Sequence, residues 1–393
     1  MDIKDVFPAD GRSPRNYCDN CNGHLDLAYA DFEEIVSGVE FRVYGLPVLR
    51  CPVCAKDHLP DRSRFLIIHS HEQCTQSGTP EFVANRRKIE QDFGFTTVPF
   101  LYDPDDYHYI PGLQRDWDEG FLTPVFFKRS VLLKYDNAPG YRVRFASTTY
   151  GDIDTGRTSF PFGINRHGNV VMWLGDIAKL PVEEQYYLRS ENLPSDHSIG
   201  SEFYDGQIEC IFTARAREDE LFRLRSNFIE ACFLRFGKKV AHLDAEVMEL
   251  ALSFNGPVVD TDKERRHVAD TLNKLYIESL DNGALGEVMT SLGGDPKKLG
   301  SLKRLQGLLE LASPGADVAT VLSPLYVLYD LRVAYSHLTS AATGQEILKK
   351  VTDRLALARD ADLPTIYVEL VDRLSATFEA LTALIETPAA DEV

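Results

Sequence analysis

The sequence has no long apolar run and contains few cysteines. None of its apolar stretches approaches the roughly 18–20 residues that a membrane-spanning helix requires, so we expect no membrane association. The first residues, Met1 to Asp5, lack the basic and then apolar composition of a secretory signal peptide. Four of the seven cysteines form two close pairs, which argues against a disulfide framework. We therefore expect a cytoplasmic protein.

Positive charge is also in deficit. Lysine and arginine number 42 against 60 aspartates and glutamates, which gives a formal net charge of −18. A surface of this sign repels polyanions, so any nucleic-acid binding must depend on a local basic site. The charge argues against a protein that coats DNA, but it does not exclude an enzyme that cleaves RNA in a small cleft.

The length and composition predict a folded α+β protein with more than one domain. A chain of 393 residues can bury two or three cores, and its apolar fraction of 44% is ordinary for a globular protein. Only the first dozen residues and the tail from Thr387 to Val393 have the composition of loose ends. We divide the chain into a zinc-binding ribbon module (14–75), a β-rich central domain with a sensor or regulatory role (95–205) and an α-helical bundle (206–386).

Two Cys-x-x-Cys pairs near the start are the most specific motif of the sequence. They are Cys18 with Cys21 and Cys51 with Cys54. Two short hooks of this kind direct four thiolates at one ion, which is the donor set of a tetrahedral Zn²⁺ site. Because four cysteines fill the coordination sphere, we predict a structural zinc ion rather than a catalytic one.

Other residues near the hooks offer alternative ligands. Cys74 is one of them, and four histidines are the others: His24, His58, His69 and His71. For His69-Ser-His71 we favour the end of a strand with exposed imidazoles over a role as metal ligands.

The first two parts have the alternation and turn residues of β structure. Strands are predicted within 39–48, around a turn at Gly45 and Pro47, and at 65–68, 121–127, 131–135 and 141–145. The segment 164–174 predicts a hairpin with its tip at 166–169, and Pro181 marks the start of a short helix. We expect a mostly antiparallel arrangement in the central domain.

The third part has helical periodicity throughout. Helices are predicted over 215–236, from the capping residue Thr261 to about Asp281, over 301–312, from Ser323 and Pro324 to about Thr339, and over 344–359 and 363–386. One apolar stripe at three- and four-residue spacing should face the bundle core: Leu325, Leu328, Leu331, Tyr335 and Leu338.

The same helix carries Arg332 and His337, five residues apart. On a regular helix they are separated by about 140° around the axis and about 7.5 Å along it. The long arginine side chain, a facing helix or a second subunit could bring the two groups together.

An Arg-x4-His pattern on a late helix of a bundle resembles the HEPN-type ribonucleases. The resemblance covers about 240–386 and implies a metal-independent endoribonuclease, a hydrolase whose RNA site is shared across a homodimer. In that case Arg332 would hold the scissile phosphate and His337 would transfer protons. Asp330 and Tyr335 would be possible helpers, although Tyr335 fits the core stripe better. Many members of the family have a polar residue directly after the arginine, where this chain has Val333.

The stretch Tyr44-Gly-Leu-Pro-Val-Leu-Arg-Cys-Pro-Val-Cys54 resembles the zinc-binding module of the MqsA/YgiT-type antitoxins. The resemblance covers about 40 residues. It does not extend to the DNA-binding part of those antitoxins, because no helix-turn-helix is apparent downstream.

The sequence is compatible with three functional hypotheses. The first is a ribonuclease of toxin–antitoxin or antiviral-defence type, in which the zinc module and central domain respond to a regulatory protein or a phage-derived trigger. The second is a non-catalytic interaction or regulatory protein with a degenerate HEPN-like bundle. The third makes the central region a small-ligand or enzymatic domain, with the segment from Trp173 to Asp176 lining its pocket. Ser195-Asp-His197 contains the residue types of a hydrolase triad, but we interpret it as a loop, since triad members converge from separate segments.

Overall fold

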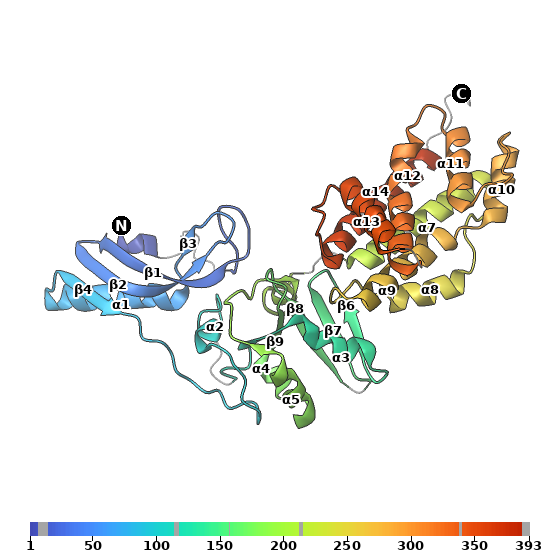
Figure 1. Cartoon of the computed structure of the whole chain (residues 1–393). Coiled ribbons are helices and arrows are strands. Elements are labelled where there is room, and N and C mark those ends of the chain that lie inside the picture. The colour runs from blue at the N-terminus through green and yellow to red at the C-terminus, as the bar shows by residue number, and fades with distance from the viewer. Residues whose placement is uncertain (7–14, 114–117, 157, 212–214, 338–339, 387–393) are drawn as a thin grey trace. The chain divides into compact units, whose positions relative to one another are not determined.

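The chain forms an α+β fold, and every strand of its described part belongs to the first half (Figure 1). The computed structural model describes residues 1–6, 15–113, 118–156, 158–211, 215–337 and 340–386. These residues form two compact units, Met1–Ala214 and Arg215–Val393. The expected loose tail lies outside the described residues, as do residues 7–12 of the N-terminal dozen. Among the described helices, none has the length and apolar character needed to cross a bilayer.

The N-terminal sheet of the first unit is built on a long hairpin. Strands β1 and β2 pair in antiparallel fashion around Ser37 and Gly38, whose φ values of 42° and 92° suit a two-residue hairpin turn. Strands β3 and β4 both pair with β2. Strand β3 runs antiparallel to β2, whereas β4 runs parallel to it. The elements of this region are η1 (Ile3–Val6), β1 (Asp26–Val36), β2 (Val39–Arg50), β3 (Asp57–His58), α1 (Asp61–Ser77) and β4 (Glu81–Asn85).

Two predictions for this region are wrong. The predicted strand at 65–68, together with His69 and His71, lies inside α1, which buries Ser63, Ile67, Ser70 and Cys74 along one face. Two serines on that face conceal its helical period, and a four-residue apolar run does not by itself distinguish a strand from a helix. The predicted turn at Gly45 and Pro47 is also absent, because β2 continues through both residues to Arg50.

The central region forms one six-stranded antiparallel sheet, as predicted, in the order β10-β5-β9-β8-β7-β6. The hairpin of β8 and β9 and the helix after Pro181 are confirmed. The strand predicted at 131–135 is instead mostly helix α3, which buries Leu132 and Tyr135 one turn apart. The elements are α2 (Pro104–His108), β5 (Pro124–Phe127), η2 (Arg129–Val131), α3 (Leu132–Asn137), β6 (Arg142–Phe145), β7 (Tyr150–Asp154), β8 (Ser159–Ile164), β9 (Val170–Trp173), α4 (Leu174–Ile177), α5 (Val182–Ser190), β10 (Asn192–Leu193), α6 (Glu202–Tyr204) and η3 (Asp205–Glu209).

A charged cluster joins α5 to α3 in this region. The carboxylate of Glu184 accepts hydrogen bonds from Lys134 Nζ at 2.7 Å, Tyr135 Oη at 2.9 Å and Tyr141 Oη at 2.6 Å. Burial by itself would raise the pKa of Glu184, but these three donors lower it. The ionised carboxylate therefore stabilises the folded state.

We expect Glu184→Gln to lower the free energy of unfolding at pH 7 by about 1–3 kcal/mol. The reason is that a neutral amide replaces the charged carboxylate that accepts the three hydrogen bonds. Since the folded-state pKa is lowered, this stabilisation is present above the ordinary value near 4.5 and is lost as the pH falls below it. Urea unfolding at pH 7 and pH 4 checks the prediction. Glu183→Gln, at an exposed neighbouring position, is the matched control. An equal effect of both variants, or a difference that grows toward pH 4, would contradict it.

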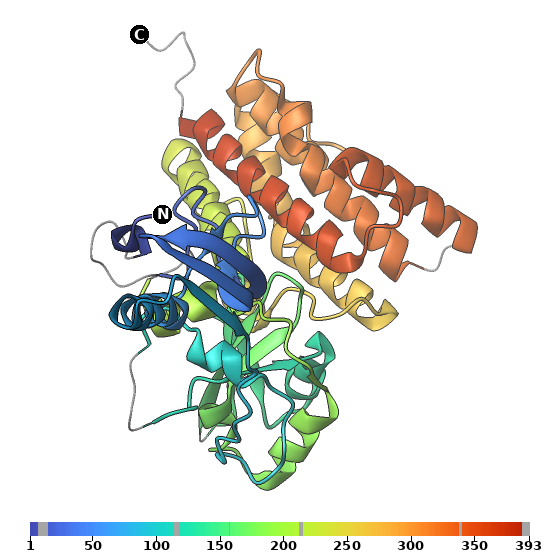
Figure 2. The same ribbon diagram turned by 90° about the vertical axis from the view of Figure 1, so that its left-hand side faces the viewer.

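The second unit is all helical in its described part. Its elements are α7 (Arg217–Phe236), α8 (Asp244–Ser253), α9 (Asp262–Asn273), η4 (Lys274–Glu278), α10 (Asn282–Ser291), α11 (Ser301–Ala312), α12 (Val318–Ser336), α13 (Ala341–Leu355) and α14 (Leu363–Glu386). Helix α14 packs along α7 (Figure 2), and α12 packs against α9, α11, α13 and α14. The predicted stripe on α12 is confirmed at Leu325, Leu328 and Leu331, which are all buried, whereas Leu338 lies outside the described residues.

The helix ends follow the predicted capping residues in most cases. Gly237 ends α7 with φ +64°, and the Thr261 side chain accepts a bond from the Glu264 amide at the start of α9. The prediction of Ser323 as an N-cap is wrong. Helix α12 begins at Val318 behind Asp317, which accepts a bond from the Thr320 amide, and it continues through Pro324. Packing of Val318 and Leu322 in the core favours this earlier turn despite the proline.

Candidate functional site

The four cysteines of the two hooks meet in one cluster. Their Sγ atoms lie within 4.8 Å of one another, with 3.5 Å between Cys18 and Cys54, 3.4 Å between Cys21 and Cys51 and 3.8 Å between Cys21 and Cys54. Four sulfurs at about 2.3 Å from a tetrahedral ion lie about 3.8 Å apart, so the spacing fits such an ion. The structure therefore confirms that these residues form a cluster that could bind a metal.

The two hooks share one backbone geometry. In each hook, the amide of the residue after the second cysteine donates to the carbonyl of the first, from Asn22 to Cys18 at 2.8 Å and from Ala55 to Cys51 at 2.9 Å. Both donors have left-handed backbones, with φ +58°. This turn directs the two thiols of a hook to the same side. The Cys-x-x-Cys spacing alone was sufficient to predict it.

The alternative ligands lie in different places. Cys18, Asp19 and His58 form a second possible donor group that shares one cysteine with the cluster. His24 binds Asp205, His69 and His71 lie on α1, and Cys74 is buried with its thiol 3.7 Å from the Glu81 carbonyl oxygen. Among the described residues, His58 is therefore the only alternative ligand that shares a donor group with one of the four cysteines.

Residues that flank the first hook fasten it to the central region of the same unit. Tyr17 Oη donates to Asp205 Oδ1 at 2.5 Å, and His24 Nε2 lies 3.0 Å from the same oxygen. The two rings are 4.8 Å apart, and Asp205 belongs to η3. Further along, Tyr29 and Arg86 both bind Asp105, which is buried. The first cysteine hook is thus joined to the central region by polar contacts on either side of it. We call the bonds of Tyr17 and His24 to Asp205 the docking contacts.

Ser195 and His197 meet a third group that the sequence did not suggest. Ser195 Oγ donates to Asp106 Oδ2 at 2.5 Å, and His197 Nδ1 lies 2.7 Å from Asp106 Oδ1. Burial raises the pKa of Asp106. Burial would lower the pKa of His197, but the bond to Asp106 and its charge raise it. Ser195 Oγ is thus closer to the aspartate than to His197 Nδ1, which lies 3.5 Å away, so this cluster joins α2 to the 195–197 loop and is not a nucleophile with its base.

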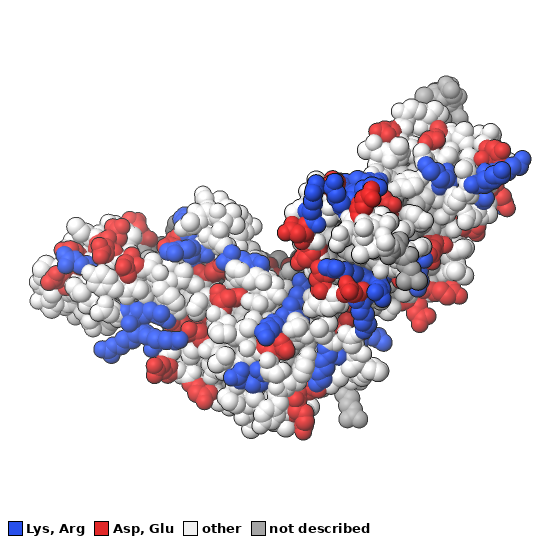
Figure 3. Space-filling view, in the orientation of Figure 1, with Lys and Arg blue, Asp and Glu red and all other residues white. Residues whose placement is uncertain are grey.

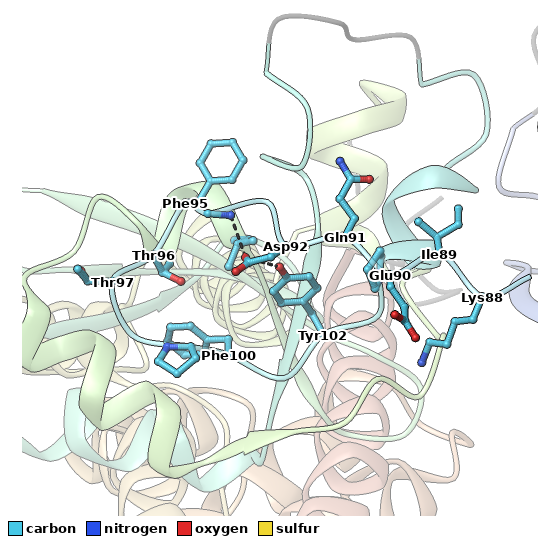
Figure 4. A pocket seen from close by; sticks show the side chains of 14 residues that line it. Lys88, Ile89, Glu90, Gln91, Asp92, Phe95, Thr96, Thr97, Phe100 and Tyr102 are labelled. Carbon is cyan, nitrogen blue, oxygen red and sulfur yellow. Dashed lines mark hydrogen bonds between the residues drawn. The ribbon is translucent and has the colours of Figure 1, made fainter.

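A cavity of about 420 Å³ opens in the irregular segment that follows β4 (Figure 4). Its wall comes from residues 88–104 and Leu174, and within that wall Tyr102 Oη donates to Asp92 at 3.2 Å. Lys88 and Glu90 give the wall both signs of charge, and Lys88 is paired with Asp103. Trp173 is buried in the core, so of the segment 173–176 only Leu174 borders this cavity.

The structure places Arg332 on the last turns of α12 and His337 directly after its end. Arg332 Nε lies 3.4 Å from Asp270 Oδ1, and its NH2 group lies 3.1 Å from Glu278 Oε1. The arginine side chain keeps 29% of its surface exposed. His337 is exposed and extended, with φ −84° and ψ 146°, and it has no hydrogen bond or ion pair to a described residue. Both groups are therefore accessible to a ligand.

The two possible helpers point elsewhere. Asp330 binds Arg354 of α13 at 3.1 Å. Tyr335 packs against the core of the bundle, and burial raises its pKa to about 12. Arg332 instead contacts Asp270 and Glu278, and neither residue was predicted from the sequence. Asp270 lies 62 residues from Arg332, and no local pattern connects them.

No protein-family model matches the chain, and the comparisons with curated proteins and with solved structures find no similar protein. The site must therefore be interpreted from its own chemistry.

Proposed function

We propose that the chain is a metal-independent endoribonuclease of toxin or antiviral-defence type, with a HEPN-like helical unit. The observation that carries the proposal is the exposed imidazole of His337 at the end of α12, five residues after the partly exposed guanidinium of Arg332. A guanidinium fork that binds phosphate and an imidazole that takes up and releases a proton are the two elements on which this mechanism of RNA cleavage without a metal depends.

Each residue has a definite role in this mechanism. Arg332 binds the non-bridging oxygens of the scissile phosphate and offsets the charge that builds up on them. His337 takes the proton of the ribose 2′-OH, whose oxygen attacks phosphorus while the bond to the 5′-oxygen breaks. The leaving oxygen gains a proton, and the products are a 2′,3′-cyclic phosphate and a free 5′-OH end.

A homodimer suits this chemistry. One proton is removed and another is supplied in each cycle, and each chain has one such histidine at this helix end. A second copy could bring its own His337 as the acid. We therefore propose that the active form is a dimer with two helical units face to face.

The N-terminal unit supplies control in this proposal. The cysteine cluster would hold a structural Zn²⁺, as in the MqsA/YgiT-type modules that its sequence resembles, with all four thiolates as ligands. An unregulated ribonuclease would damage the RNA of its own cell. We therefore assign the zinc module and the central sheet to the response to a regulatory protein or a phage-derived trigger. The cytoplasm supplies the substrate and keeps the thiols reduced.

The test is direct. Purified protein is incubated with total RNA in the presence of EDTA, and the cleavage ends are mapped for position and phosphate chemistry. We expect cyclic phosphate ends that depend on His337. Cleavage that requires an added metal, or that leaves 5′-phosphate ends, would overturn the mechanism.

A non-catalytic interaction protein is the second candidate, and the surroundings of Arg332 favour it. Asp270 and Glu278 occupy two of its donors and would repel a phosphate. On the face in Figure 3, lysine and arginine are interspersed with aspartate and glutamate. This candidate predicts no RNA cleavage under any trigger, together with partner binding that is lost on Cys51→Ser.

A further inference from the structure

The contacts between α9 and α12 define how the two helices run past each other. Arg332 on α12 reaches Asp270 on α9, and Tyr335, three residues later on α12, lies under the guanidinium of Arg265, whose centre is 5.8 Å from the ring. The two helices therefore run antiparallel, and the end of α12 lies beside the start of α9. The exposed His337 is thus level with the first turns of α9.

Arg266 belongs to this part of α9. It lies one turn, about 6 Å, before Asp270 and on the same side of the helix, because residues four apart lie above one another. Its neighbour Arg265 contacts Tyr335, and Asp270 contacts Arg332. Arg266 therefore lies between two residues of α9, Arg265 and Asp270, that contact α12.

Arg266 is exposed and has no hydrogen bond or ion pair to a described residue. This is unusual in the bundle, because aspartates lie four residues before and after it. Asp262 is 3.7 Å from Arg265 instead, and Asp270 faces Arg332. Most other arginines of the described bundle are engaged: Arg217, Arg223, Arg225, Arg235, Arg265, Arg304, Arg354 and Arg373.

We infer that Arg266 binds a second phosphate of a single-stranded RNA, next to the phosphate held by Arg332. The inference rests on the proposed function. On a chain with a net charge of −18, an RNA strand needs local cations to remain bound, and an unpaired guanidinium offers its full fork of donors to phosphate. Arg266 would orient the strand so that the 2′-OH of the scissile nucleotide meets His337.

The experiment measures binding and cleavage separately. Affinity for a fluorescein-labelled single-stranded RNA is measured in the His337→Ala background at several salt concentrations, and cleavage is measured with His337 present. Arg266→Ala is expected to weaken binding about 5–10-fold and to reduce the slope of log affinity against log salt by about 0.7, which corresponds to one phosphate contact on a single strand. In cleavage it should raise KM more than it lowers kcat. Arg266→Lys should restore the salt slope.

Arg87→Ala is the matched control, because Arg87 is also exposed and unpaired among the described residues but belongs to the first unit. It should leave affinity and slope unchanged. Equal affinity and slope for Arg266→Ala and the parent chain would overturn this inference alone, provided that cleavage still depends on His337. If the parent neither cleaves nor binds the RNA, the proposed function and this inference both fail.

Discussion

Replacing His337 with alanine is expected to lower the rate of RNA cleavage at least about 100-fold, while affinity for the RNA stays within a few-fold of the parent chain. The reason is that the imidazole transfers protons in the transition state, and a positioned acid or base typically contributes a factor of about 10²–10⁴ to the rate. The side chain is exposed and makes no bond to a described residue, so its removal should not destabilise the bundle. Single-turnover kinetics on a labelled RNA, together with thermal unfolding of both proteins, provide the measurement.

Two further variants make the result specific. His167→Ala removes an exposed histidine at the tip of the β8–β9 hairpin in the other unit and should leave the rate unchanged. Arg332→Ala should lower both affinity and rate, because it removes the donors to phosphate and also leaves Asp270 and Glu278 without their cation. If the three variants cleave RNA as the parent does, catalysis by this pair is excluded and the non-catalytic alternative gains support.

Replacing Cys51 with serine is expected to abolish metal binding and to loosen the first hook from the central region, where Asp205 accepts its docking contacts. Cys51 is fully buried, and its thiol lies 3.4 Å from that of Cys21, so a neutral hydroxyl there removes one of four converging donors. Because a site of this kind is assembled by the fold, the free energy of metal binding is also folding free energy, about 10–16 kcal/mol in zinc-finger peptides. Elemental analysis should show about one zinc per chain in the parent and close to none in the variant.

Hydrogen exchange follows the structural consequence. The amides of Leu25 and Leu27 donate to Asn16 and His197, and both lie beside the docking contacts. They should exchange faster in Cys51→Ser, whereas the amides of β7, β8 and β9 should keep their protection. Cys74→Ser removes a buried thiol outside the cluster and is the control, which should retain the metal.

A second variant separates the metal from the interface it supports. Asp205→Asn should weaken the bonds to Tyr17 and His24 and speed exchange at Leu27, yet retain the metal. Full zinc content in Cys51→Ser would show that the cluster is not the metal site. Unchanged exchange in a metal-free chain would show that the docking contacts do not depend on the hooks.

Local sequence patterns determined much of this protein. The two Cys-x-x-Cys spacings were sufficient to predict a four-thiol cluster, because a hook of this length closes on itself through one left-handed residue. The caps at Thr261 and Gly237 located the corresponding helix ends, since capping bonds form between residues a few positions apart. The stripe of leucines on α12 likewise reported its buried face before any partner was known.

Tertiary structure decided the rest. Segment 65–68 belongs to α1, whose buried face includes two serines that hide its helical period in the sequence. Helix α12 begins before Pro324 because Val318 and Leu322 pack in the core. The partners of Arg332, Tyr17 and Ser195 are acidic residues that lie far away in sequence, on helices that meet only after folding. Sequence periodicity reports which face of an element is buried, but it carries no information about which distant side chain lies opposite. That pairing is set by how the elements pack, and it determines the electrostatic environment in which each candidate residue acts.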